Sequence, residues 1–158
     1  MNKKRFAIVF GLILSVIIFS GIASGMGSSP GIPQIKISGQ DARLSPVMIG
    51  VGSIFMKIEN SGNADDSIVN ARLALLGTVT ELHDIKDGKM VKIDRINIPA
   101  GSAVELKPKG LHIMVFKMPE TIKDGSEVTL HLTFERSGEK QVTLKFGKWA
   151  NEKMGHGH

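Results

Sequence analysis

The sequence predicts an all-β protein, an antiparallel sandwich or barrel built as a single domain. Short segments with alternating or β-branched residues recur along the chain, separated by Gly, Asn, Asp or Pro, and long helical periodicity is absent. In order, the expected strands are residues 35–38, 52–59, 79–82, 90–93, 103–106, 111–116, 128–134 and 141–146. One stretch, residues 64–71, has the pattern of a helical turn. We assign the β-domain to residues 35–147.

The first 23 residues have the pattern of an export signal or a membrane anchor. Three cations at residues 3–5 precede an uncharged apolar run over residues 6–22, and small residues follow it. The run is also just long enough to span a bilayer, so a cleaved signal peptide and an uncleaved anchor both fit. Either one places the domain outside the cytoplasm, in the periplasm or at the outer face of the membrane. Residues 24–34, rich in Gly, Ser and Pro, predict a flexible linker.

Charge and composition exclude nucleic acid as a partner and disulfides as staples. The formal net charge of +5 falls to +2 without the three cations of the leader, and no basic stripe remains. The chain has no cysteine, although an oxidising compartment would permit disulfides. The part of the chain that follows the leader is long enough to bury a core without them.

A histidine and a methionine in the segment over residues 111–116 form a candidate metal-binding pair. His112 and Met114 are two residues apart, so they share a strand face at a spacing of about 7 Å, and their tips can converge on one atom. A thioether competes poorly for hard ions and well for Cu(I). The alternative is that Met114 only fills a gap in the core.

A second pair flanks the Asp-Gly turn region over residues 84–89. His83 precedes this region and Met90 follows it, so a hairpin would bring both to one end of the sandwich. Together with His112 and Met114 they would supply two nitrogens and two sulfurs, a neutral donor set that favours monovalent copper. By contrast, alternation over residues 128–134 predicts that His131 faces solvent without a ligand role.

Three classes of function remain open: a copper carrier, an exported β-sandwich interaction or assembly module with no metal site, and a metal enzyme. Blue-copper electron transfer uses a cysteine, which the chain lacks. A zinc hydrolase would need a carboxylate base beside the histidines, and Asp84 is the only nearby candidate. We therefore expect no enzymatic activity.

Several segments resemble the PCuAC family of periplasmic copper chaperones, over residues 35 to 146 or so. The resemblance is carried by Met90 and by residues 81–83 (ELH), 98–101 (IPAG), 104–107 (VELK) and 110–114 (GLHIM). Met90, His112 and Met114 repeat the family's M-X21-H-X-M spacing. The family's aromatic residue near Asp41 is missing. The chain also has a shorter loop between His83 and Met90 than the family's roughly ten residues, and a shorter hairpin loop changes where its ends point.

The resemblance implies a cupredoxin-like β-barrel that binds Cu(I) through four residues, His83, Met90, His112 and Met114. It further implies delivery of copper to an acceptor protein, such as the copper subunit of cytochrome c oxidase or a Sco-like thiol copper protein. Such a chaperone would contact the membrane only through its N-terminal segment.

The C-terminal tail, residues 148–158, contains a second group of donors. Met154, His156 and His158 could form an auxiliary site, with nitrogen donors better matched to Cu(II) than the thioether site. The alternative is a disordered terminus with incidental histidines.

Overall fold

The computed structural model describes residues 31–148 and confirms the all-β prediction. This range contains ten strands and no helix. They are β1 (Ile35–Leu44), β2 (Gly52–Asn60), β3 (Asp66–Leu73), β4 (Val79–Lys86), β5 (Lys89–Ile93), β6 (Ile96–Ile98), β7 (Ser102–Leu106), β8 (His112–Phe116), β9 (Glu127–Phe134) and β10 (Gly138–Lys148). No helix within the described range could therefore cross a membrane. The predicted leader and most of the predicted linker and tail lie outside the described residues.

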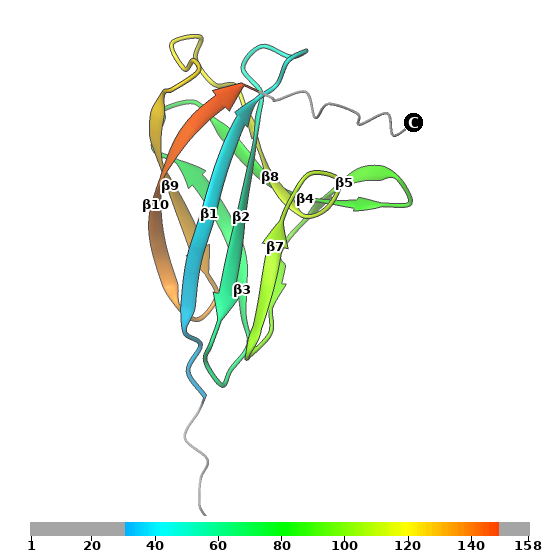
Figure 1. Ribbon diagram of the computed structural model, residues 1–158, viewed down its shortest axis with the longest axis vertical. Helices are drawn as coiled ribbons and strands as arrows, with labels where there is room; N and C mark the ends of the chain where they lie inside the picture. Colours follow the sequence, from blue (N-terminus) through cyan, green and yellow to red (C-terminus); the bar gives the residue numbers. More distant parts are fainter. Residues whose placement is uncertain (1–30, 149–158) are drawn as a thin grey trace, which may run out of the picture.

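The strands form one sheet that curls into a nearly closed, barrel-like sandwich (Figure 1). The strand order is β5-β4-β8-β2-β1-β10-β9-β3-β6, and β7 pairs with β2 beyond the end of β8. Strands β1 and β10 are parallel, and the other paired strands are antiparallel. Strand β2 pairs with β8 along its first half and with β7 along its second, so its two ends have different neighbouring strands.

The core lies between the two layers of the sandwich and follows the predicted alternation. In β9, Val128, Leu130, Leu132 and Phe134 are buried, while the residues between them are more exposed. This confirms the predicted facing of that strand. Side chains from β2, β8 and β10 complete the core; they include Ile54, Ile58, Ile113, Val115, Leu144 and Phe146.

The predicted helical turn over residues 64–71 is wrong, because Asp66–Leu73 forms strand β3. This strand pairs with β6 on one side and β9 on the other, so its backbone groups are bonded within the sheet. Ile68, Ala71 and Leu73 are buried in the core. Packing and pairing on both sides override a weak local helical pattern.

The β4–β5 hairpin is longer and tighter than the sequence predicts. Strand β4 continues to Lys86 and β5 begins at Lys89, so much of the expected loop is strand. The two turn residues, Asp87 and Gly88, have φ values of 50° and 72°. Positive φ at both positions is the requirement of a type I′ turn, which matches the twist of the flanking strands. The hairpin projects sideways from the body of the barrel (Figure 1).

Two buried polar side chains near the far end of β2 have several hydrogen bonds each. The Asn60 side-chain amide donates to the carbonyls of Ala64 and Ile98 and accepts from the backbone N–H groups of Gln34 and Gly62. The Asp66 carboxylate accepts from three backbone N–H groups, those of Ser67, Arg136 and Ser137. These bonds fix the loops at that end of the barrel.

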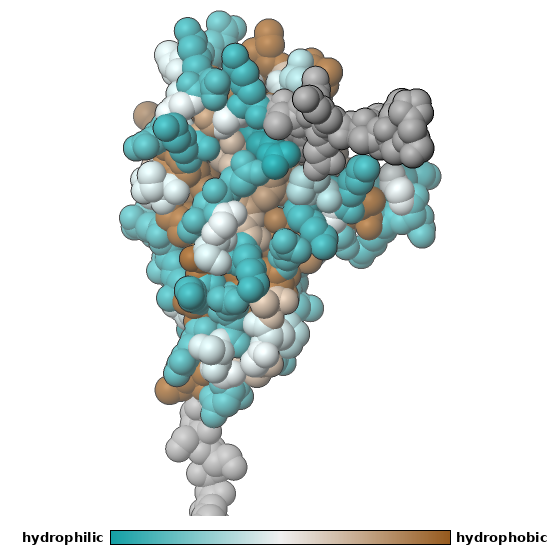
Figure 2. All heavy atoms as spheres, viewed as in Figure 1, coloured by the Kyte–Doolittle hydropathy of each residue, from teal (hydrophilic) through white to brown (hydrophobic). Residues whose placement is uncertain are grey.

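The opposite end of the barrel carries an exposed apolar loop between β1 and β2. Val47 and Ile49 are 84% and 87% exposed, so neither is held by the core. The loop is closed by hydrogen bonds from the backbone N–H groups of Val47 and Met48 to Ser45 Oγ. Figure 2 shows apolar side chains at the end of the molecule where Figure 1 places this loop.

Candidate metal centre

Strand pairing brings the two predicted histidines face to face. In the register of β4 and β8, His83 lies opposite His112, and Glu81 lies opposite Met114. Ser53 of β2 lies on the other side of Met114. These side chains occupy the face of the sheet opposite the one that Ile113 and Val115 turn to the core. The sequence predicts a strand that ends at residue 82, just before His83. In the structure β4 continues to Lys86, so His83 lies inside the strand.

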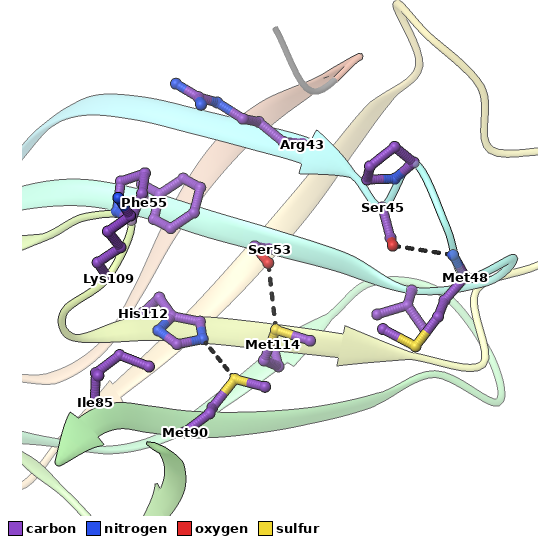
Figure 3. A pocket seen from close by; sticks show the side chains of 13 residues that line it. Arg43, Ser45, Met48, Ser53, Phe55, Ile85, Met90, Lys109, His112 and Met114 are labelled. Atoms are coloured by element: carbon purple, nitrogen blue, oxygen red, sulfur yellow. Dashed lines mark hydrogen bonds between the residues drawn. The ribbon is translucent and has the colours of Figure 1, made fainter. Parts of the chain in front are cut away.

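Met90 reaches the same place from the hairpin. Its sulfur lies 3.2 Å from His112 Nε2 (Figure 3). Met90 pairs with Ile85 at the base of the tight turn, so the short loop is what folds the thioether back over the sheet. Half of the Met90 side chain is exposed, whereas His83, His112 and Met114 are buried.

The hydrogen bonds of His112 determine which of its nitrogens can bind a metal. Nδ1 lies 2.8 Å from the Gly110 carbonyl oxygen, which can only accept, so Nδ1 carries the proton. Burial lowers the pKa of His112, with the hydrogen bond to Gly110 opposing it, so the neutral ring is favoured. Nε2 then presents a lone pair toward the Met90 sulfur.

The contact between His112 and Met90 thus joins two electron donors. Bond lengths of about 2.0 Å to nitrogen and about 2.3 Å to sulfur, the values for zinc, would place two donors of one tetrahedral ion about 3.5 Å apart. The observed separation of 3.2 Å is close to that value. The pair is therefore near the spacing at which both atoms could bind one ion.

Met114 supplies the second thioether. It is buried, and the Ser53 hydroxyl donates a hydrogen bond to its sulfur at 3.2 Å (Figure 3). A thioether is a weak acceptor with two lone pairs, so this bond orients the sulfur and leaves one lone pair for a metal. No sequence pattern points to Ser53, because its contact with Met114 depends on the pairing of β2 with β8.

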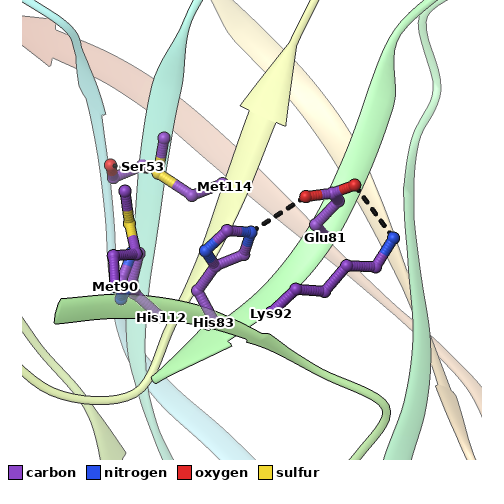
Figure 4. Close-up of polar contacts among 7 residues, drawn as sticks. All are labelled: Ser53, Glu81, His83, Met90, Lys92, His112 and Met114. Carbon is purple, nitrogen blue, oxygen red and sulfur yellow. Dashed lines mark hydrogen bonds and ion pairs between the residues drawn. The ribbon is translucent and has the colours of Figure 1, made fainter. Parts of the chain in front are cut away.

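His83 completes the group from the side of β4. Its ring centroid lies 5.7 Å from that of His112. Nε2 lies 2.9 Å from Glu81 Oε2, and the buried Nδ1 has no hydrogen-bond partner among the described residues (Figure 4). The hydrogen bond from His83, followed by that from Lys92, lowers the pKa of Glu81. The carboxylate that is hydrogen-bonded to His83 is thus Glu81, whereas Asp84 Oδ1 accepts the Ile85 backbone N–H.

An open pocket of about 430 Å³ gives access to three of the four candidates. Met90, His112 and Met114 line it, together with Met48 and Phe55, whereas His83 does not. Among the described residues that line the pocket none is a carboxylate, and two, Arg43 and Lys109, are cationic. Within residues 31–148 there is also no group of three or more His, Asp or Glu side chains that could hold a metal ion. Such surroundings disfavour hard divalent ions.

The remaining candidates lie elsewhere. His131 is on β9, in the other part of the sandwich, where its Nδ1 pairs with Glu139. It makes no contact with the candidate ligands that the structure records. Met154, His156 and His158 lie outside the described residues.

Solved structures with this fold include two PCuAC domains, one of them copper-bound, and a CuI form of a third protein. The copper-bound PCuAC domain from PmoF2 is 20% identical, with a TM-score of 0.63 over 74% of this chain and 95% of that one. The apo PCuAC domain from PmoF1 is 19% identical, with a TM-score of 0.64 over 74% and 96%. The solution structure of CuI-DR1885 from Deinococcus radiodurans is 20% identical, with a TM-score of 0.59 over 72% and 80%. The likeness confirms the predicted cupredoxin-like fold.

The sequence itself defines the family. Residues 35–146 match the family described as "LpqE-like: Putative lipoprotein LpqE-like". The match covers well over half of the chain, so the protein belongs to the LpqE-like family, with the fold of a PCuAC domain. No curated protein matches the chain.

Proposed function

We propose that this protein is an extracytoplasmic copper carrier that binds Cu(I) through His83, Met90, His112 and Met114. The observation that carries the proposal is the convergence of His112 Nε2 and the Met90 sulfur at 3.2 Å, beside the buried Met114 thioether. Neutral imidazole and thioether donors without a carboxylate suit monovalent copper and suit calcium, magnesium and zinc poorly.

The structural neighbours support the same function from another side. Two solved domains with this fold are described as copper-bound and as a CuI form. The fold is therefore one on which copper sites occur. The four residues proposed here come from strand β8 and the β4–β5 hairpin, which both contribute side chains to the pocket of this chain.

Transfer of copper would proceed by ligand exchange. Met90 is the exposed donor, so it is the one that an acceptor can displace first, while the buried donors keep hold of the ion. An acceptor with thiolates binds Cu(I) more tightly than neutral donors do, so transfer needs no energy source. We propose the copper subunit of cytochrome c oxidase or a Sco-like thiol protein as the acceptor, and a carrier role without enzymatic turnover.

The two ends of the chain would have supporting roles. The N-terminal segment would export the domain or tether it outside the cytoplasm. Met154, His156 and His158 would collect Cu(II) as an auxiliary arm. Deleting residues 152–158 should then lower the Cu(II) stoichiometry, and unchanged Cu(II) binding would exclude the arm.

The proposal is tested by competition for Cu(I) against a colourimetric chelator. The wild-type protein should withhold one Cu(I) from the chelator, and Met114→Leu should bind it at least about tenfold more weakly, which corresponds to about 1.4 kcal/mol. The loss has a simple cause, because leucine replaces the thioether at similar volume and cannot bind copper.

Met56→Leu is the matched control. Met56 is another buried methionine, but it belongs to the core cluster on the opposite face of β2. This variant should bind Cu(I) as the wild type does. Absence of Cu(I) binding by the wild type, or equal binding by Met114→Leu, would contradict the proposal and favour an interaction module without a metal site.

A further inference from the structure

A chain of three hydrogen-bonded side chains borders the candidate metal centre. Glu81 lies between two donors: His83 Nε2 is 2.9 Å from its Oε2, and Lys92 Nζ is 2.9 Å from its Oε1 (Figure 4). Glu81 and His83 are two residues apart on β4 and share a strand face. Lys92 lies opposite His83 on β5. The carboxylate is therefore fixed from both sides by the β4–β5 hairpin.

This arrangement decides where the proton of the neutral His83 ring resides. An ionised carboxylate accepts hydrogen bonds and donates none, so Nε2 must carry the hydrogen and Nδ1 must keep a lone pair. Nδ1 is buried without a hydrogen-bond partner among residues 31–148. In Figure 4 it points toward the side where Met90, His112 and Met114 lie. A buried acceptor left without a partner costs free energy, which binding of an ion at that atom would recover.

We propose that Glu81 is a positioning residue that holds His83 in the Nε2–H form, so that His83 binds Cu(I) through Nδ1 while His112 binds through Nε2. The inference rests on the proposed function and assigns the binding atoms within that site. A carboxylate that receives the second N–H of a metal-binding histidine orients the ring and raises its basicity. The His112 ring is oriented by a different group, the Gly110 carbonyl, which accepts the hydrogen bond from Nδ1–H.

The two histidines thus bind through different ring nitrogens, because different groups accept the hydrogen bond from each ring. The His112 ring is fixed by the backbone carbonyl of Gly110, just before β8, and a substitution cannot easily remove a backbone carbonyl. His83 is fixed by a side chain, so its orientation can be changed by a single substitution at Glu81. Lys92 adds to this by holding the second carboxylate oxygen, which balances the negative charge beside a neutral donor set.

The test begins with the copper-free full chain, labelled with ¹⁵N at histidine, at a pH above the ordinary pKa of histidine. Two-dimensional NMR that correlates ring nitrogens with ring protons identifies the protonated nitrogen of each ring. We expect Nε2–H for His83 and Nδ1–H for His112. On addition of Cu(I), the resonances of His83 Nδ1 and His112 Nε2 should shift most.

Two substitutions of Glu81 separate positioning from a general structural role. Glu81→Gln retains a side-chain oxygen that can accept from His83 Nε2, so it should keep the tautomer and most of the Cu(I) affinity. Glu81→Leu cannot accept, so His83 should populate both tautomers and Cu(I) affinity should fall by about 10–100-fold, the usual cost of losing an outer-shell partner. The matched control is Glu105→Leu, because Glu105 of β7 is another carboxylate paired with a lysine, Lys107.

The outcomes distinguish this inference from the proposed function. An Nδ1–H tautomer for His83, or wild-type tautomer and affinity in Glu81→Leu, would overturn the role of Glu81 while leaving Cu(I) binding intact. A wild-type protein with the expected tautomer that binds no Cu(I) would refute the proposed function, and with it the assignment of Nδ1 as a copper donor. Rescue by Gln together with loss in Leu would establish the positioning role.

Discussion

Buried polar side chains near the two ends of β2 differ in whether their atoms have hydrogen-bond partners. At one end, the Asp66 carboxylate accepts three backbone N–H groups and the Asn60 amide makes four hydrogen bonds. Beside the first half of β2, at what we call the histidine end, His83 Nδ1 has no partner among the described residues, and His112 Nε2 faces the Met90 sulfur. Buried polar groups are ordinarily bonded, so metal-binding donor atoms left open beside a pocket indicate binding rather than folding.

The difference separates stability from function within one small domain. The bonds of Asn60 and Asp66 hold loops together. The histidine end instead leaves donor atoms open beside a pocket, at some cost to stability. Substitutions at the two ends should therefore have opposite effects: those at Asp66 should lower the free energy of unfolding, and those at the histidine end should lower Cu(I) affinity.

The largest effect on stability is expected from Asp66→Ala. The substitution leaves three backbone N–H groups without their acceptor, and we expect the free energy of unfolding to fall by about 3 kcal/mol. Cu(I) affinity of the folded protein should not change. Urea unfolding measures the first quantity and chelator competition the second. Asp65→Ala is the control, because Asp65 accepts one bond, from the exposed Ala100 N–H, and should lose less than about 1 kcal/mol.

His83→Leu should have the converse profile. Cu(I) affinity should fall by about 100-fold, or about 2.7 kcal/mol, because one donor is lost. The free energy of unfolding should change little, since leucine removes a buried nitrogen without a partner among the described residues, which is favourable, and also the hydrogen bond from Nε2 to Glu81, which is unfavourable. Chelator competition and urea unfolding of the same preparation check both. A variant that loses stability and keeps its copper would reverse the contrast between the ends.

A smaller effect is expected from Met90→Leu. The side chain is half exposed, so the free energy of unfolding should change by less than about 0.5 kcal/mol. Cu(I) affinity should fall by about tenfold, because the chelating thioether is gone. Met48→Leu provides a control of equal exposure on the same pocket, since both side chains are 50% exposed. Equal losses in both variants would mean that the pocket wall, rather than Met90, determines affinity.

The smallest effect concerns pH. Burial alone would raise the pKa of Asp66, but hydrogen bonds from Ser137, Arg136 and Ser67 outweigh burial and hold this pKa below its ordinary value. The stability due to ionised Asp66 is thus full above the ordinary aspartate pKa and is lost as pH falls through the lower, folded value. Urea unfolding across the acid range should show a shallower loss in Asp66→Asn than in the wild type. Parallel curves would exclude this contribution.

The sequence predicted which candidate residues lie close together better than it predicted the strands that carry them. His112 and Met114 follow from strand alternation and spacing, because both depend on neighbours along one strand. The extent of β4 was missed, since an Asp-Gly pair signals a turn without stating how far the strands continue. Strand β3 was missed because its pairing with β6 and β9 decides its structure. Glu81 stands two residues before His83, so strand alternation alone predicts that the two side chains share a face.

The central claim is that the open donors of the histidine end bind copper through nitrogen and thioether sulfur. X-ray absorption at the copper edge of the Cu(I)-loaded protein tests it most directly. The chain has no cysteine, so any sulfur bound to copper belongs to methionine. We expect two nitrogen and two sulfur neighbours in the wild type, and one sulfur fewer in Met114→Leu. A copper environment of nitrogen or oxygen alone, the same in both proteins, would contradict the account.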